Sequence, residues 1–147
     1  MQKTTMTKKA DAEKNRAWYE IDATDVILGK LATTTADLLR GKQKTHFNQH
    51  VDCGDFVIIR NASKIRLSGN KAAKEKWYNH SGYIGGLRTR TGKEMIASYS
   101  DELIIGAVKG MLPKNRLARQ IIKKLHVYKD QGKDHTAQSP KIIKIKY

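Results

Sequence analysis

The feature that most constrains the fold is a continuous apolar run, DFVIIRN, at residues 55–61. A half-exposed strand alternates apolar with polar residues, whereas an unbroken apolar run is typical of a strand that is covered on both faces. Strands of this kind belong mainly to sheets that carry helices over their faces. The run therefore predicts the centre of an α/β domain.

Upstream of this run, the sequence predicts a strand and a helix. WYEIDA at residues 18–23 alternates as a strand does, and residues 28–42 follow with apolar side chains on one helical stripe and Gly41 placed to end the helix. Strands that alternate with helices over 147 residues predict one layered α/β domain, with a mixed sheet and helices on both faces. We expect this domain to span residues 17–147, including a basic C-terminal tail, and residues 1–16 to form a flexible basic extension.

Downstream of the run, the local signals are more varied. Residues 64–70 alternate basic with apolar side chains, which predicts a short strand that ends in turn residues. Residues 71–92 combine aromatic residues, four glycines and several cations, which predicts a short strand or ribbon plus a long ordered loop. The tail at residues 141–147 predicts either a last strand or an arm.

Capping signals mark the helices of the C-terminal half. Thr91 and Glu94 have the spacing of a capping box, and we expect Ser100 to be the N-cap of the next helix. Asn115 is expected to cap a further helix, RLARQIIKKL, at residues 116–125. The apolar side chains of this helix share one face, and its cations lie away from that face.

The charge of the chain is strongly positive and unevenly distributed. The formal net charge is +15, and nearly all of the excess of lysine and arginine over acidic residues lies after residue 60. Such a charge favours a polyanionic partner, nucleic acid first and an anionic membrane surface second. Residues 1–18 have no apolar core of the kind that a signal peptide needs. The sequence also has no apolar run of membrane-spanning length, and its single cysteine is Cys53. We therefore expect a reduced, cytoplasmic protein with a scaffold half and a basic binding half.

The densest basic stretch is VKGMLPKNRLARQIIKKLHVY at residues 108–128, which contains six lysines and arginines and no carboxylate. A solvated helix face usually mixes both signs, and a membrane-surface helix favours bulky apolar residues where this stretch has small aliphatic ones. A calmodulin-type target and a phosphate-binding face are the other interpretations. The charge excess favours the phosphates of RNA, because no DNA-binding motif is present. The cations predicted to hold phosphates are Lys109, Lys114, Arg116, Arg119, Lys123 and Lys124.

A second basic region surrounds KWYNHSGYIGGLR at residues 76–88. Cations for phosphates, aromatic planes for unpaired bases and glycines for close backbone approach form a mixture that binds irregular RNA. Trp77 and Tyr83 fit equally well as core aromatics, with only the cations facing outward. The charged and polar side chains predicted to line an RNA crevice here are Lys71, Lys74, Lys76, His80, Arg88 and Arg90.

Enzymatic chemistry has little support in the sequence. Gly86 and the GK dipeptide at Gly92 are separated by five residues, where a phosphate loop needs four. The one cluster of enzymatic type is HFNQHVDCGD, with His46, His50, Asp52, Cys53 and Asp55. It fits a small metal-dependent or thiol hydrolase less well than a hydrogen-bonded turn before the central strand, since nothing fixes the geometry of a third, orienting group. The sequence thus predicts no enzyme, cofactor, metal site or small-molecule substrate.

Four segments resemble the bacterial large-subunit ribosomal protein 13 family. They are DATDVILGKLAT, HVDCGDFVIIRNASKIRLSGNK, YNHSGYIGGL and VKGMLPKNRLAR, which occur in the family's order and spacing within about residues 18–139. The resemblance implies a three-layer α/β/α fold with a mixed sheet. It also implies a structural, non-enzymatic protein of the cytoplasmic ribosome, which binds large-subunit ribosomal RNA beside neighbouring ribosomal proteins during early assembly. A free regulatory RNA-binding protein would share the same sequence features.

The resemblance implicates three segments in RNA binding, the SGNK turn at residues 68–71, the HSGYIGG loop at 80–86 and the KGMLPKNRLAR segment at 109–119. With the preceding cations of residues 64–66, these segments complete the candidate site. The positions that they add are Lys64, Arg66, Ser68, Gly69, Asn70, Ser81, Gly82, Tyr83, Gly85 and Gly86.

The chain departs from the family's pattern at three places. Ala118 stands where the family commonly has glycine, which limits close backbone approach of RNA at that point. Cys53 occupies a position usually held by Thr or another small residue, which weakens the enzymatic interpretation further. Residues 1–16 extend beyond the usual start of the family, so the resemblance assigns them no role; an arm that orders on RNA is one hypothesis for them.

Overall fold

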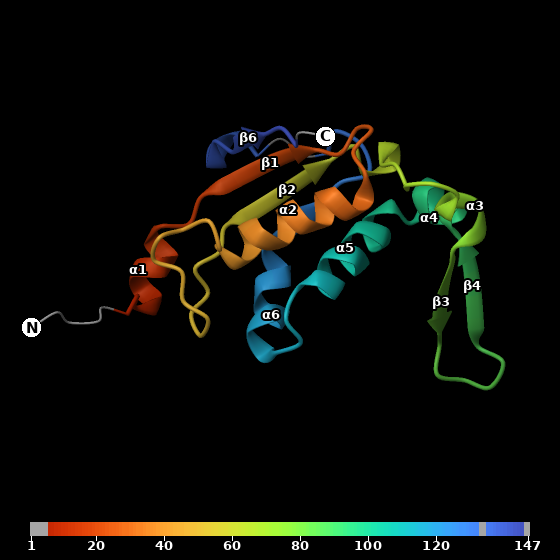
Figure 1. The fold of residues 1–147 in the computed structure, drawn as a ribbon, viewed down its shortest axis with the longest axis horizontal. Coiled ribbons are helices and arrows are strands. Elements are labelled where there is room, and N and C mark those ends of the chain that lie inside the picture. The colour runs from red at the N-terminus through yellow and green to blue at the C-terminus, as the bar shows by residue number, and fades with distance from the viewer. Residues whose placement is uncertain (1–5, 133–134, 146–147) are drawn as a thin grey trace, which may run out of the picture.

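The computed structural model describes residues 6–132 and 135–145 and places the apolar run at the centre of a four-stranded sheet (Figure 1). The strand order is β5–β2–β1–β6, and all three pairings are parallel. Val57, Ile58 and Ile59 in the middle of β2 are fully buried, which confirms a strand covered on both faces. The bounds of the strands are Trp18–Asp22 for β1, Phe56–Arg60 for β2, Leu125–Val127 for β5 and Lys141–Ile143 for β6.

Two helices cover one face of this sheet. Helix α2 (Leu28–Arg40) and helix α5 (Ser100–Met111) pack against each other and over β2 and β5. Ile21, Ile59 and the other inward side chains of this face join both helices in one core cluster. The helix predicted at residues 28–42 is confirmed, and it ends as expected at Gly41, whose φ of 73° lies in the left-handed region.

The C-terminal segment covers the opposite face. Trp18 stacks on Phe56 with ring centroids 4.3 Å apart, and also on His135, which precedes the 3₁₀ helix η3 (Thr136–Gln138). The single α/β domain is confirmed. Parallel and antiparallel pairing, however, lie in two separate sheets, where we expected one mixed sheet.

The antiparallel pair is a hairpin that projects from the body of the domain (Figure 1). It confirms the ribbon predicted within residues 71–92, and the capping box is also confirmed, because Thr91 and Glu94 make both of its hydrogen bonds. The elements of this region are η1 (Ala62–Lys64), α3 (Lys71–Lys74), β3 (Lys76–His80), β4 (Leu87–Thr91) and α4 (Gly92–Ser98).

Two local predictions are wrong. Residues 64–70 hold a single bridge, between Ile27 and Arg66, in place of a strand, because the chain first turns through η1. The alternation that suggested a strand reflects burial of Ile65 between exposed cations. Ser100 is the first residue of α5 and is fully buried, so Tyr99 occupies the N-cap position without a side-chain hydrogen bond.

The helix predicted at residues 116–125 is shorter than expected. Helix α6 (Arg116–Ile121) passes into the 3₁₀ helix η2 (Ile122–Lys124), and β5 begins at once with Leu125. A 3₁₀ helix has 3.0 residues per turn, so the side chains after Ile121 leave the positions that an α-helix would give them. The tail at residues 141–147 fitted either a strand or an arm; its first three residues form the edge strand β6, and residues 146–147 lie outside the described residues.

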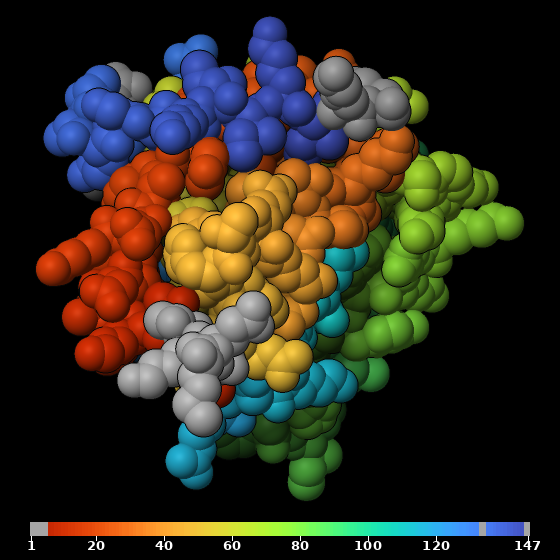
Figure 2. Space-filling view, turned by 60° about the vertical axis from the view of Figure 1, so that its left-hand side comes forward, coloured from red at the N-terminus to blue at the C-terminus, as the bar shows by residue number. Residues whose placement is uncertain are grey.

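The described part of the N-terminal extension contacts the loop that precedes β2. Residues 9–14 form helix α1 (Lys9–Lys14), in which Ala12 is buried. Thr7 donates a hydrogen bond to the carbonyl of His46, and Lys44 donates one to the carbonyl of Asn15. The two segments lie next to each other on one face of the molecule, in red and gold (Figure 2). The flexibility of residues 1–16 stays a prediction, and residues 1–5 lie outside the described residues.

Candidate nucleic-acid interface

Helix α6 and the 3₁₀ helix η2 together present three cations to solvent. The Asn115 side chain accepts a hydrogen bond from the Ala118 N–H at 2.8 Å, which confirms the predicted cap and fixes the start of the helix. Ala118 and Ile121 are buried, so the opposite face points outward. The cations of α6 and η2 that are exposed, and that form no ion pair within residues 6–132 and 135–145, are Arg116, Arg119 and Lys123.

A groove of about 730 Å³ runs between α5 and α6. Its described lining includes the cations Lys109, Lys114 and Arg119 and no carboxylate. Gly106 and Gly110 lie one turn apart on α5, and a Cβ added at either would meet no atom of the chain. Glycine inside a helix costs about 1 kcal/mol relative to alanine. Because packing within the chain does not require these glycines, they fit close approach of a partner's backbone.

Lys124 does not belong to this cationic surface. Its side chain is buried, and its Nζ donates hydrogen bonds to Asp52 Oδ1 at 2.5 Å and to the Leu39 carbonyl at 3.5 Å. Burial lowers the pKa of Lys124, and the bond to Asp52 offsets part of that effect. The prediction that Lys124 faces outward with Lys123 is therefore wrong, because the 3₁₀ turn points it inward.

The hairpin has two different faces, since side chains alternate along each strand. Trp77 and Arg90 are directly paired across the strands, and Trp77 packs against the core cluster, so the core interpretation holds for this aromatic. Arg90 forms an ion pair with Glu102 at 3.2 Å and lies 3.6 Å above the Tyr99 ring. Arg90 is thus occupied within the chain.

The free groups of the hairpin lie at both of its ends, Lys76 at the base and the others toward the tip. Lys76 and Arg88 are exposed, and Tyr78 and Tyr83 are 65% and 80% exposed. Tyr83 therefore does not belong to the core. The neighbouring Ile84 is an apolar side chain that is fully exposed at the tip. It is not among the individual residues predicted for the site, because nothing in its local pattern distinguishes it from a core residue.

The glycines and polar residues of the tip shape the turn itself. Gly82 and Gly85 have positive φ of 89° and 74°. His80 Nδ1 accepts a hydrogen bond from the Gly82 N–H at 2.9 Å, and the Ser81 N–H donates to the Gly86 carbonyl. These residues hold Tyr83 outward, which is a positioning role and leaves direct contact with RNA a prediction.

The SGNK turn is exposed and connects the sheet region to the hairpin. Ser68, Gly69, Asn70, Lys71 and Lys74 are all exposed, and so are Lys64 and Arg66 before them. Lys64 lies near Asp22. Burial raises the pKa of Asp22, but hydrogen bonds from Asn61 and Thr24 together with the charge of Lys64 outweigh burial and lower it.

The cluster considered for catalysis is occupied by structural contacts. The Cys53 side chain is fully buried, and its Sγ contacts the His46 carbonyl. Asp52 pairs with Lys124 and Arg16, and Asp55 pairs with Lys44 and accepts the Ala17 N–H. In the described part of the chain, no group of three His, Cys, Asp or Glu side chains is arranged to hold a metal. The cluster forms the turn before β2.

Fold and charge together define a class of protein, a strongly basic α/β domain. Its free cations lie on the face of one helix, in one groove and on one projecting hairpin. None of its described helices is both long enough and apolar enough to cross a bilayer. The Ribosomal protein L13 family model matches residues 16–134. The chain belongs to the ribosomal protein L13 family.

Bacterial relatives match almost the whole chain. The large ribosomal subunit protein uL13 of Ureaplasma urealyticum is 56% identical over 146 residues, which is 99% of each chain. Those of Malacoplasma penetrans and Listeria monocytogenes are 57% and 49% identical, again over 99% of each chain. The residues before position 16, which precede the family model, therefore have counterparts in these relatives, so the expectation that they extend beyond the usual start does not hold for them.

Proposed function

We propose that this chain is a structural constituent of the large subunit of the cytoplasmic ribosome, which binds large-subunit ribosomal RNA and helps early subunit assembly. Membership of a family of ribosomal proteins supports this role, and so do the printed names of the relatives. The observation that carries the RNA-binding part is the groove between α5 and α6, whose cations have no carboxylate beside them. The protein is not an enzyme.

Phosphates would be held from two sides of the groove. Lys109 and Lys114 lie on one side and Arg119 on the other, while Arg116 and Lys123 extend the same charge along α6 and η2. Each phosphate that a cation neutralises releases a counterion, so affinity falls steeply with salt. Specificity would come mainly from the shape of the RNA, because few of these side chains suit readout of base edges.

The hairpin would form a second anchor. Lys76 and Arg88 carry its free positive charge, and the exposed rings of Tyr78 and Tyr83 can stack on unpaired bases. The SGNK turn and the cations Lys64 and Arg66 extend the same basic surface. Lys124 is left out of the proposed RNA contacts, because it is buried.

Sedimentation of a native lysate on a sucrose gradient, with and without ribonuclease, tests this function against a free regulatory RNA-binding protein. We expect the chain to migrate with large subunits and to lose that position after ribonuclease treatment. Migration as a free small protein that ribonuclease does not change would overturn the proposal.

A further inference from the structure

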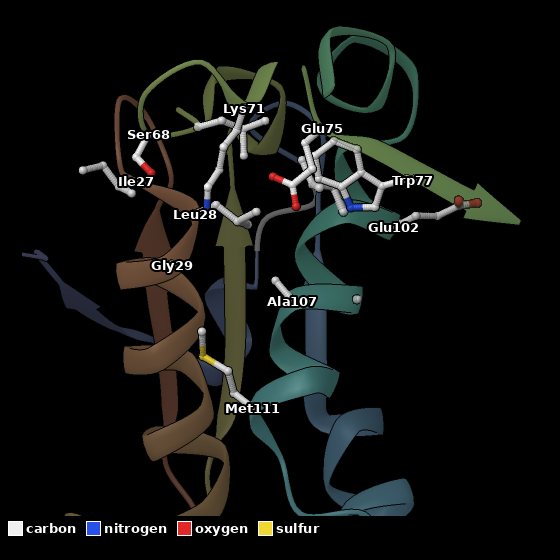
Figure 3. A pocket seen from close by; sticks show the side chains of 13 residues that line it. Ile27, Leu28, Gly29, Ser68, Lys71, Glu75, Trp77, Glu102, Ala107 and Met111 are labelled. Carbon is white, nitrogen blue, oxygen red and sulfur yellow. The ribbon is translucent and has the colours of Figure 1, made fainter. Parts of the chain in front are cut away.

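A cavity of about 500 Å³ lies between α2, α5 and the base of the hairpin (Figure 3). Its lining is largely apolar, with Leu28 from α2, Leu103 from α5 and the partly buried ring of Trp77 from β3. Met111 closes one end, where its Sγ lies 3.5 Å from Thr33 Oγ1. The cavity and the α5–α6 groove lie along neighbouring faces of α5 and share Gly106, but the lysines and arginine of the groove do not line the cavity.

The ionisable side chains of this cavity differ from those of the α5–α6 groove. They are Lys71, Glu75 and Glu102, so carboxylates outnumber cations in a chain that is otherwise strongly basic. Glu102 is paired with Arg90, but Glu75 is exposed and forms no ion pair with any described residue. In Figure 3 the Glu75 carboxylate lies beside Trp77 at the mouth of the cavity.

This combination suits a protein segment better than RNA. Carboxylates at the mouth repel phosphates, whereas they attract lysine or arginine. An apolar cavity of this size admits large aliphatic or aromatic side chains, and such anchors dominate protein interfaces. Proteins that share an RNA surface are themselves rich in lysine and arginine, so a cationic residue beside an apolar anchor is available in a neighbour.

We propose that this cavity docks a segment of a neighbouring protein of the large subunit. A large apolar side chain of that segment enters between Leu28, Trp77 and Met111, and an adjacent lysine or arginine pairs with Glu75. The inference rests on the proposed function only in taking the neighbour from the same subunit. It assigns the two hollows beside α5 to different partners, RNA in the α5–α6 groove and protein in this cavity.

Photo-cross-linking in assembled subunits tests the assignment. One variant of the full chain carries p-benzoylphenylalanine in place of Met111, inside the cavity, and a second carries it in place of Gln120, which is exposed on α6 among the proposed phosphate contacts. Each variant is expressed in cells, large subunits are isolated and irradiated, and the cross-linked segment is mapped by mass spectrometry. We expect position 120 to cross-link to ribosomal RNA. Position 111 should cross-link to one protein segment that has lysine or arginine next to a large apolar residue.

A charge substitution makes the test independent of the identity of the captured protein. Glu75→Gln should lower the yield of the cross-link from position 111 about twofold to fivefold, as for loss of one exposed ion pair. The matched control is Glu13→Gln on α1, which makes the same change in charge at the opposite end of the molecule (Figure 1). It should leave the yield unchanged, and neither variant should change the cross-link from position 120.

The outcomes separate the two proposals. Three results would overturn the docking proposal and leave the RNA proposal intact. Position 111 could cross-link to RNA, or it could give no cross-link while position 120 reacts with RNA. The third result is a cross-link yield from position 111 that Glu75→Gln leaves unchanged. Failure of position 120 to cross-link to ribosomal RNA would instead count against the proposed RNA surface. It would leave a protein cross-link from position 111 standing.

Discussion

The turn before β2 and the α5–α6 groove each gather three cations, but only the turn supplies carboxylates to match them. At the turn, Asp52 and Asp55 pair with Arg16, Lys44 and Lys124. In the groove, the described lining has Lys109, Lys114 and Arg119 and no acid. We call the five residues at the turn (Arg16, Lys44, Asp52, Asp55 and Lys124) the paired cluster. Each of its cations has a carboxylate partner within the domain, whereas the groove lining offers no carboxylate to its cations.

The contrast is sharpest at two adjacent residues, Lys123 and Lys124. Lys123 is exposed and without an ion pair among the described residues, while Lys124 is buried against Asp52. A buried ion pair contributes little net stability, yet removal of one partner leaves an uncompensated charge. The same residue type therefore has a structural role at one position and a proposed binding role at the next.

The largest expected effect follows from breaking the paired cluster on its acidic side. Asp52→Ala leaves Lys124 buried without a carboxylate and removes the hydrogen bond from the Gly54 N–H. We expect the free energy of unfolding to fall by about 3–5 kcal/mol. Urea denaturation of the full chain measures this change.

The matched variant is Lys124→Met. It should cost far less than Asp52→Ala, because Asp52 keeps its ion pair with Arg16 and methionine fills the buried space of the lysine stem. If both variants lowered the free energy of unfolding equally, the cost of Asp52→Ala would not come from a buried Lys124 charge left without its partner.

A smaller effect, of opposite sign, is expected in the groove. Gly110→Ala adds a methyl group that meets nothing in the chain, so it should raise the free energy of unfolding by about 0.5–1 kcal/mol. The same methyl group narrows the groove and should weaken binding to large-subunit ribosomal RNA. Thermal melting and a filter-binding titration measure the two effects. A variant that is stabilised but binds RNA as well as the original chain would remove the groove from the RNA surface.

The smallest expected effect concerns pH, on the sheet face opposite α2 and α5. Burial lowers the pKa of His126 below its ordinary value near 6.5, and the nearby charge of His135 lowers it further. The unfolded chain therefore binds more protons than the folded chain below about pH 6.5, so stability should decline as the pH falls from 6.5. Urea midpoints at pH 7.5 and 5.5 measure the decline.

His126→Phe should make that decline shallower, because the stacked ring with Trp18 is retained without the titrating group. His50→Gln, at an exposed position, is the control and should leave the decline unchanged. A decline that is the same in both variants would assign the pH dependence to other groups.

The elements that the sequence predicts well are those with a strong local cause. The unbroken apolar run of β2, the left-handed Gly41 and the Asn115 cap each follow from the residues that form them. Strand β5 was missed because it has only three residues and follows two lysines that continue a helical pattern. Its position beside β2 depends on a long-range pairing that a local window does not contain.

The candidate site shows the same limit. Composition and family resemblance identify the basic segments, but only tertiary structure decides which cations are free. Arg90 is occupied by Glu102 and Tyr99, and Lys124 by Asp52, although their immediate neighbours in sequence resemble those of free cations. The acidic partners lie 12 and 72 residues away, respectively, along the chain.

The most direct test of the contrast between free and paired cations uses the two adjacent lysines. Lys123→Met and Lys124→Met make the same chemical change one residue apart, and the measurement is the salt dependence of binding to large-subunit ribosomal RNA. We predict that Lys123→Met lowers the slope of log affinity against log salt by about one, while Lys124→Met leaves the slope unchanged. Equal slopes for the two variants, or a loss for Lys124→Met alone, would contradict the account.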